Sequence, residues 1–192
     1  DHLAVDRVVL VGHSMGGMIA QDFAAEHQDR LAALALSGTS PAFGSPDGAF
    51  QQKVLAARLG PLDAGGTMAD LAPDIVREVI GPSADPDGIA LATEAMGRVP
   101  APPYGAAIAA LVASDRRAAL SEIAVPTLVI AGENDRNAAP AMMERVAARI
   151  PHARYVCLPH AGHLANVEQP AAFEAALDGF LDTLEPSAWT SD

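Results

Sequence analysis

Two continuous apolar runs, residues 8–11 and 31–36, flank a segment with the spacing of a helix. Runs of this kind are typical of strands that are buried on both faces of a sheet. In the segment between them, 16–26, Ile19 and Phe23 stand four residues apart. A strand, a helix and a second strand in this order form a βαβ unit, in which the two strands are parallel. The sequence therefore predicts an α/β protein with a parallel sheet.

The same pattern returns near the carboxyl end. Residues 126–131 and 153–158 predict two further strands, and a helical pattern follows each of them. Pro140 and Pro170 fall in the first turns of these helices, where the missing N–H of proline is tolerated. The last helix has an apolar stripe of Phe173, Leu177, Phe180, Leu181 and Leu184. Four strands of one sheet are thus expected.

Residues 41–123 differ from both flanking regions, because Gly, Pro and Asp separate short helical segments and no strand pattern occurs. Helices are expected near 49–59, 67–80, 87–98 and 104–120. A helical insert between two parallel strands usually stands at one end of the sheet, over a binding crevice. Packing elsewhere on the molecule is the alternative. We expect a first core segment at 1–40 and a helical cap at 41–123. A second core segment at 124–185 and a loose tail at 186–192 are expected to follow.

The junction between the first strand and its helix carries the pattern Gly12-x-Ser14-x-Gly16. Glycine on both sides would let Ser14 adopt a strained conformation at the end of the strand without clashes between Cβ atoms. The N-terminus of the following helix directs backbone N–H groups to the same point, where an oxyanion would form. Ser14 is therefore the candidate nucleophile.

A dinucleotide site is the competing interpretation of this turn, because Gly12, Ser14 and Gly17 also resemble a degenerate cofactor-binding fingerprint. That fingerprint expects an acidic residue at the end of the next strand. The second strand is followed instead by Ser37 and Gly38. We therefore expect no cofactor.

A serine hydroxyl is a poor nucleophile unless a base activates it. Of the six histidines, His160 and His163 follow the fourth strand and so share the sheet edge of Ser14. Gly162 would let the loop bend toward the serine, and the family resemblance described below favours His163 over His160. His13, inside the turn, is expected to be structural.

The acid that orients the histidine should lie at another strand end on the same edge. Glu133 and Asp135 both follow the third strand, and either carboxylate could reach a ring N–H; we prefer Asp135. Asp115 is a rival on chemistry alone. Its neighbours Arg116 and Arg117 favour a helix cap or a surface ion pair for it instead.

Three segments together resemble the α/β-hydrolase family. Residues 10–21 resemble its nucleophile elbow, 125–135 its acid strand and 161–170 its histidine loop, and the order serine, acid, histidine is that of the family. The resemblance covers nearly the whole chain and is looser in the insert. The histidine loop and residues 104–117 are similar to 3-oxoadipate enol-lactonase-like hydrolases. The same elbow occurs in carboxylesterases, cofactor-free haloperoxidases, carbon–carbon bond hydrolases and acyltransferases.

The resemblance implies a serine hydrolase that cleaves a small ester or lactone. Ser14 would attack the carbonyl, His163 would take and return the proton, and Asp135 would hold the imidazole. The N–H of Met15 would stabilise the tetrahedral oxyanion. An apolar acyl pocket is expected at Phe43, Phe50, Met68, Met96 and Tyr104, with packing inside the cap as the equal alternative.

Two further residues, Glu168 and Asn166, are expected from the same resemblance to fix the histidine loop. The family's second oxyanion donor comes from a loop that precedes the elbow, and only 11 residues precede Gly12. The first strand would then have an uncovered edge and face. We expect a carboxyl-terminal portion of a longer hydrolase rather than a deliberately small domain. By itself it would have little or no activity and marginal solubility, and a catalytically silent fragment is the alternative function.

The chain has 192 residues, with 24 acidic and 12 basic side chains and a net charge of −12. Such a balance argues against binding to nucleic acid or to an anionic membrane, and no apolar run of about 18 residues predicts a membrane span. The expected partner is a small-molecule substrate. The single cysteine, Cys157, allows no internal disulfide and no cysteine-based zinc site, so no metal is expected. Cys157 is expected to be buried in its strand, and a reducing, cytoplasmic location fits.

Overall fold

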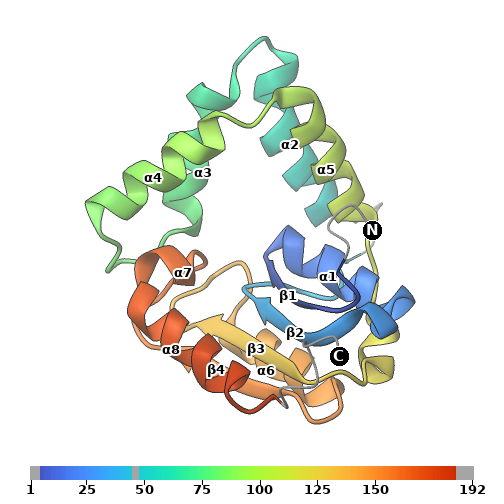
Figure 1. Cartoon of the computed structure of the whole chain (residues 1–192). Coiled ribbons are helices and arrows are strands. Elements are labelled where there is room, and N and C mark those ends of the chain that lie inside the picture. The colour runs from blue at the N-terminus through green and yellow to red at the C-terminus, as the bar shows by residue number, and fades with distance from the viewer. Residues whose placement is uncertain (1–4, 45–47, 185–192) are drawn as a thin grey trace.

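A computed structural model describes residues 5–44 and 48–184 (Figure 1). In these residues the chain forms one parallel sheet in the order β1-β2-β3-β4. Its strands are β1 (Val8–His13), β2 (Leu31–Ser37), β3 (Thr127–Gly132) and β4 (Arg154–Leu158). The expected α/β class, the parallel sheet and its strands are confirmed. β1 continues through Gly12 to His13, two residues beyond its apolar run.

Helices cover both faces of the sheet. The core helices are α1 (Met15–Glu26), α6 (Pro140–Arg149), α7 (Ala165–Glu168) and α8 (Pro170–Leu181), with short 3-10 helices η1 (Gln28–Arg30) and η2 (Ala119–Glu122). Leu34 and Leu36 of β2 pack with residues of α1 and α6, while Ala33 and Ala35 pack with residues of α7 and α8. Because side chains alternate along a strand, this one segment contributes to both layers of the core.

The two outer strands are less buried than the sequence suggested. β2 and β3 are buried along their whole lengths, but Val11 of β1 is 46% exposed and Cys157 of β4 is exposed. The expectations that residues 8–11 are buried on both faces and that Cys157 is buried are therefore wrong. The reason is that β1 and β4 are edge strands of the described sheet, and α8 packs mainly on β3 and β4.

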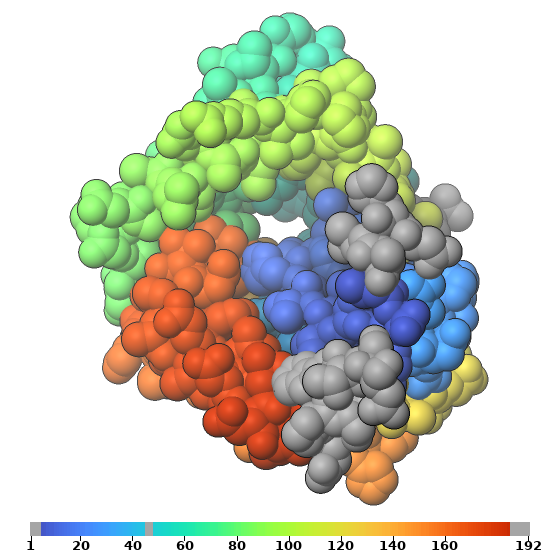
Figure 2. Space-filling view, viewed as in Figure 1, coloured from blue at the N-terminus to red at the C-terminus, as the bar shows by residue number. Residues whose placement is uncertain are grey.

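The insert between β2 and β3 is helical, as expected, and forms an arch over one end of the core (Figure 1). Its helices are α2 (Ala49–Asp63), α3 (Met68–Val79), α4 (Pro86–Gly97) and α5 (Ala101–Ala113). α2 packs against α5, and α3 packs against α4. An ion pair of 2.6 Å between Arg58 of α2 and Glu78 of α3 joins the two pairs. The space-filling view shows an opening between this arch and the core (Figure 2).

The arch is tied to the core at the carboxyl edge of the sheet. Ala42 and Asp115, which lie outside the two ends of the arch, form an isolated antiparallel bridge. At the end of α3, the carbonyl of Val79 accepts a hydrogen bond of 3.0 Å from the N–H of His163. The arch therefore stands over the edge that carries the candidate residues. The residue boundaries of the expected division into core and cap stay a prediction.

One expected helix has different bounds. α5 begins at Ala101 and ends at Ala113, whereas the pattern suggested 104–120. Pro102 and Pro103 lie in its first turn, where backbone N–H groups have no partner within the helix, so they do not delay its start. From Ser114 the backbone is extended, which ends the helix. The expected tail, 186–192, lies outside the described residues, and within 5–44 and 48–184 no helix has the length and apolarity to cross a membrane.

Candidate active site

Ser14 occupies a tight, strained turn between β1 and α1. Its φ is +51° and its ψ is −119°, a conformation that costs a residue with a side chain about 1–3 kcal/mol and persists only when its surroundings hold it. The end of β2 provides this support. The N–H of Ser14 donates to the carbonyl of Ser37 at 2.9 Å, and the hydroxyl of Thr39 donates to the carbonyl of Ser14 at 2.7 Å.

The glycines around the turn are not equivalent. A Cβ added at Gly12 would lie 2.6 Å from the carbonyl oxygen of Gly16, and one added at Gly17 would lie 2.5 Å from Cβ of Thr39. A Cβ at Gly16 would meet no atom within 4 Å. The expectation that Gly12 and Gly16 both serve by lacking a side chain therefore holds for Gly12 and is wrong for Gly16. Gly17 is the second position where close approach requires glycine.

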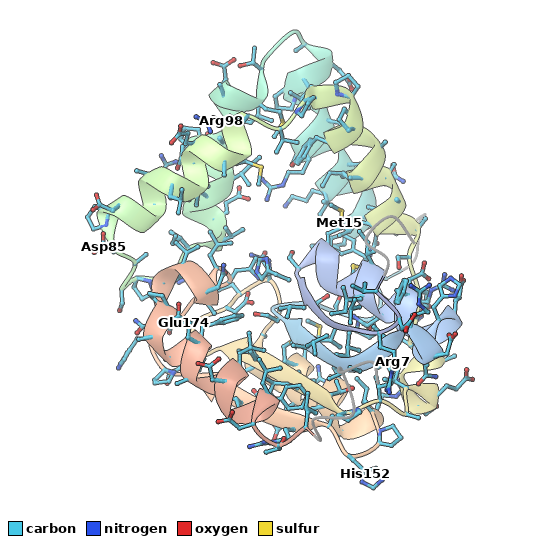
Figure 3. The ribbon with its side chains drawn as sticks, viewed as in Figure 1. Arg7, Met15, Asp85, Arg98, His152 and Glu174 are labelled. Atoms are coloured by element: carbon cyan, nitrogen blue, oxygen red, sulfur yellow. The ribbon has the colours of Figure 1, made fainter. Side chains whose placement is uncertain are left out.

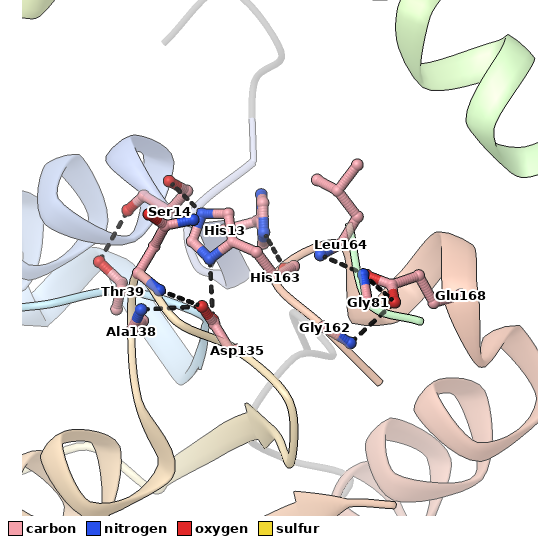
Figure 4. A network of polar contacts seen from close by, with 11 residues as sticks. His13, Ser14, Thr39, Gly81, Asp135, Ala138, Gly162, His163, Leu164 and Glu168 are labelled. Atoms are coloured by element: carbon pink, nitrogen blue, oxygen red, sulfur yellow. Dashed lines mark hydrogen bonds and ion pairs between the residues drawn. The ribbon is translucent and has the colours of Figure 1, made fainter. Parts of the chain in front are cut away.

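Ser14, His163 and Asp135 are connected in series by hydrogen bonds (Figure 4). Nε2 of His163 lies 2.9 Å from Oγ of Ser14, and Nδ1 of His163 lies 2.8 Å from Oδ2 of Asp135. A carboxylate accepts hydrogen bonds, so Nδ1 carries the proton and Nε2 is left to accept from the serine hydroxyl. The structure thus brings together the three residues that the sequence selected from three different strand ends.

The carboxylate of Asp135 is held on both oxygens. Oδ1 accepts from the N–H groups of Asn137 and Ala138 at 2.7 and 2.9 Å, and only 3% of the residue is exposed. Burial alone raises the pKa of Asp135, but the hydrogen bond and charge of His163 and the two N–H groups outweigh it, so the pKa lies below its ordinary value. Asp135 therefore stays ionised, and ready to hold the imidazole, at neutral pH.

Gly38, directly after β2, is a residue of the site that sequence reasoning missed. Its φ is +51°, and a Cβ there would lie 3.3 Å from Nδ1 of His163 and 3.4 Å from Oδ2 of Asp135. A side chain at this position would strain the backbone and press on the His163–Asp135 contact. Its only signal in the sequence was a glycine at a strand end, which also fits an ordinary turn.

His13 holds the backbone of His163, consistent with the structural role expected for it. Its Nε2 lies 2.8 Å from the carbonyl oxygen of His163, and because a carbonyl only accepts, Nε2 carries a proton. Burial, and then the charge of His163, lower the pKa of His13, although the hydrogen bond to His163 and the charge of Asp135 oppose them. The neutral ring is therefore favoured.

The N–H of Met15 is available to an incoming oxygen atom. Met15 is the first residue of α1, and no acceptor in the described part of the chain takes its N–H. Figure 3 places Met15 at the end of α1 that faces the arch. The positive end of the helix dipole adds to the attraction for an anion at this point.

This combination of a strained serine turn and a serine–histidine–aspartate series agrees with a comparison of the whole sequence with known families. Residues 1–176 match the profile of the alpha/beta hydrolase family. The chain belongs to the α/β-hydrolase family. The match includes the turn, the arch and both later strands, so the family assignment does not depend on the elbow alone.

Among known members of the family, 3-oxoadipate enol-lactonase 2 of Acinetobacter baylyi is 27% identical over 184 residues, which are 94% of this chain and 66% of the relative. The crystal structure of the enol-lactonase from Burkholderia xenovorans matches with a TM-score of 0.82 and 32% identity, over 94% of this chain and 67% of that one. A thermophilic esterase from Thermogutta terrifontis gives a TM-score of 0.84 and 27% identity, over 98% and 68%. The chain thus spans about two thirds of the length of these relatives.

The rival candidates lie apart from the series of hydrogen bonds. His160 is exposed, and its backbone N–H donates to Glu133 at 2.9 Å, so both residues serve the loop. Asp115 is exposed, and its hydrogen bonds from Arg117 lower the pKa of its carboxyl to about 2. His152, another of the six histidines, lies at the end of the molecule opposite the arch (Figure 3). In the described residues, no group of three potential ligands that could hold a metal ion is present.

The residues expected to line an acyl pocket are spread over the arch and its approach. Met68 is buried at 3% exposure, whereas Phe50 is 62% exposed and its ring is tilted against that of Phe43, with ring centres 5.7 Å apart. Met96 of α4 and Tyr104 of α5 are half-buried. The acyl pocket stays a prediction.

A groove of about 540 Å³ lies elsewhere, between α6 and the segment that follows β2. Arg145 and Arg149 of α6 and Pro41 are among its lining residues. Its lining includes neither the expected pocket residues nor Ser14, Asp135 or His163.

We expect Gly12→Ala to destabilise the fold and Gly16→Ala to leave it unharmed. The new methyl group at Gly12 must push backbone atoms apart, which costs about 1–3 kcal/mol, whereas alanine at Gly16 has open space within α1. Urea unfolding of both variants measures the difference. Equal losses of unfolding free energy would contradict the asymmetry of the turn.

A second pair of variants tests His13. His13→Phe keeps a ring but leaves the carbonyl of His163 without its donor, so we expect a loss of about 1–3 kcal/mol in unfolding free energy at pH 7.5. His13→Gln retains an N–H donor and should lose less. Equal stability of the phenylalanine variant and the parent would contradict the role of this hydrogen bond.

The same variants give a pH dependence. Because the pKa of His13 is lower in the folded chain, the unfolded chain binds more protons at pH values below about 6.5. The unfolding free energy of the parent should therefore fall as pH drops from 7.5 to 5.5, and His13→Gln, which cannot titrate, should fall less. Urea titrations at several pH values measure both slopes.

Proposed function

We propose that this chain carries the centre of a serine hydrolase that cleaves a small carboxylic ester or lactone through an acyl-enzyme on Ser14. The observation that carries the proposal is the pair of hydrogen bonds at His163, 2.9 Å to Oγ of Ser14 and 2.8 Å to Oδ2 of Asp135. A serine needs a base to become nucleophilic, and the base needs an acid that holds its tautomer. Both requirements are met in one series.

In the first half of the reaction, Oγ of Ser14 attacks the carbonyl carbon while its proton passes to Nε2 of His163. The carboxylate of Asp135 stabilises the imidazolium that results. The N–H of Met15 donates to the oxyanion of the tetrahedral intermediate, and such a donor typically contributes about 10²–10³ in rate. His163 then gives the proton to the leaving alkoxide, and the acyl group stays on Ser14.

In the second half, His163 removes a proton from water, and the hydroxide attacks the acyl carbon. Collapse of the second tetrahedral intermediate releases the carboxylic acid and returns the proton to Oγ of Ser14. With a lactone, the alkoxide formed in the first half belongs to the same molecule, so the product is a single hydroxy acid. No cofactor enters either half.

The substrate class is supported by the kind of relatives that the chain has. The names of the relatives from Acinetobacter baylyi, Burkholderia xenovorans and Thermogutta terrifontis are those of enol-lactonases and an esterase. The net charge of −12 supports a small molecule rather than a nucleic acid as partner. The single cysteine supports a cytoplasmic location.

We expect Ser14→Ala to reduce any hydrolysis of p-nitrophenyl acetate by the chain to the rate in buffer alone, because the variant lacks the attacking oxygen. Ser121→Ala is the matched control, since Ser121 lies in the short helix η2 and is exposed. A fluorophosphonate probe should label Ser14 in the parent and in the control but not in Ser14→Ala. Peptide mapping of the labelled chain identifies the site.

The outcomes separate the alternatives. Absence of labelling in the parent would contradict the proposal and favour a catalytically silent fragment. Formation of a methyl ester when methanol is added would indicate acyl transfer. Product analysis that finds cleavage of a carbon–carbon bond, or halogenation in the presence of peroxide, would replace ester hydrolysis by those chemistries.

A further inference from the structure

Glu168, the last residue of α7, is a buried carboxylate that the hydrolytic steps do not use. It is 6% exposed, and its oxygens accept hydrogen bonds from three backbone N–H groups (Figure 4). Oε2 accepts from Gly81 and from Gly162, each at 2.8 Å, and Oε1 accepts from Leu164 at 3.1 Å. Asn166, which was expected to act with it, is exposed, and its side chain makes no hydrogen bond in the described part of the chain, so that expectation is wrong.

The three donors come from two distant parts of the sequence. Gly162 and Leu164 are the two neighbours of His163 in the histidine loop, whereas Gly81 lies just beyond the end of α3 in the arch. Beside this carboxylate, the carbonyl of Val79 accepts from the N–H of His163 at 3.0 Å. The arch and the histidine loop are therefore joined by one side chain and by one main-chain hydrogen bond.

The backbones at this contact touch without intervening side chains. A Cβ added at Gly81 would lie 2.5 Å from Oε2 of Glu168 and 2.8 Å from the nitrogen of Gly162, and a Cβ added at Gly162 would overlap the nitrogen of Gly81. Glycine is needed on both sides for this approach. We call the contact among Val79, Gly81, Gly162, Leu164 and Glu168 the arch junction.

The arch junction completes the support of His163. The N–H of this residue is bound by Val79, its carbonyl by His13, and its ring by Ser14 and Asp135. Both polar groups of its main chain are thus held, one from the arch and one from the serine turn. A displacement of the end of α3 would act on the His163 backbone directly.

We propose that Glu168 is a positioning residue that couples the arch to His163, so that the placement of the imidazole relative to Ser14 depends on how the arch sits on the core. This proposal rests on the proposed function. Separation of the arch from the loop would leave two buried N–H groups, those of Gly81 and His163, without an acceptor, so the two segments move as one unit. A substrate that contacts the arch thereby influences the base that activates the serine.

The first test uses Glu168→Gln, whose amide has one oxygen and one nitrogen and so cannot accept from all three N–H groups. We expect faster amide hydrogen exchange in both 79–84 and 161–165. We also expect kcat for p-nitrophenyl acetate to fall about 10- to 100-fold with little change in KM. Glu174→Gln is the matched control, because Glu174 is exposed on α8 (Figure 3). A change in exchange confined to 161–165 would overturn the coupling.

The second variant, Gly81→Ala, keeps Glu168 and the sequence of the histidine loop and adds a methyl group from the arch side, against Oε2 of Glu168 and the nitrogen of Gly162. We expect it to speed exchange in 161–165 and to lower kcat for the same short ester, which an isolated effect on the arch would not do. Gly60→Ala of α2, where a Cβ meets no atom within 4 Å, is its control. Unchanged exchange in 161–165 would overturn the proposal, even if Glu168→Gln failed to fold.

Hydrogen exchange requires no turnover, so the two proposals can fail separately. Absence of fluorophosphonate labelling in the parent would contradict the proposed function whatever the exchange pattern. Normal labelling together with unchanged exchange and unchanged kcat in Gly81→Ala would contradict the role of the arch junction and leave the proposed function standing.

Discussion

The strained backbone of Ser14 is the feature on which the rest of the site depends. A serine at a φ of +51° is stable here because β2 lies parallel to β1 and its end supplies Ser37 and Thr39 as hydrogen-bond partners. β1 and β2 are parallel, so a crossover must connect them, and the turn at Ser14 and α1 form that crossover. The cost of the strain, about 1–3 kcal/mol, is offset by these contacts. This backbone conformation places Oγ of Ser14 at the sheet edge, within reach of a base.

The base, His163, is held within reach of this serine by hydrogen bonds with three other residues. Asp135 fixes the tautomer and the plane of the imidazole, His13 fixes the carbonyl of His163, and Val79 fixes its N–H. Each partner comes from a different element, so the geometry depends on the whole arrangement of the core and arch. The arch is joined to the site by these contacts and by the two oxygens of Glu168, which accept from Gly81 of the arch and from Gly162 and Leu164 of the histidine loop.

Local patterns in the sequence predicted the strands and the three site residues. Features that depend on contacts between distant parts of the chain were not predicted. The four strands follow from apolar runs, and Ser14, Asp135 and His163 follow from residue types at strand ends together with a family resemblance. The burial of Val11 and Cys157 depends on which strands lie at an edge, and a run of apolar residues does not contain that information. Gly38 and Gly81 are required by contacts with residues more than 80 positions away along the chain. The start of α5 was missed because two prolines lie in its first turn, where a helix tolerates them, and its end was missed because the backbone becomes extended at Ser114.

The most direct test of an acyl-enzyme on Ser14 is the mass of the chain after rapid acid quenching during turnover of an ester whose acyl-enzyme hydrolyses slowly. We expect the mass to increase by that of the acyl group, and the increase to map to the peptide that contains Ser14. The increase should be absent in His163→Ala, because the serine then lacks its base. An acyl group on another residue, or ester hydrolysis without any covalent intermediate, would contradict it.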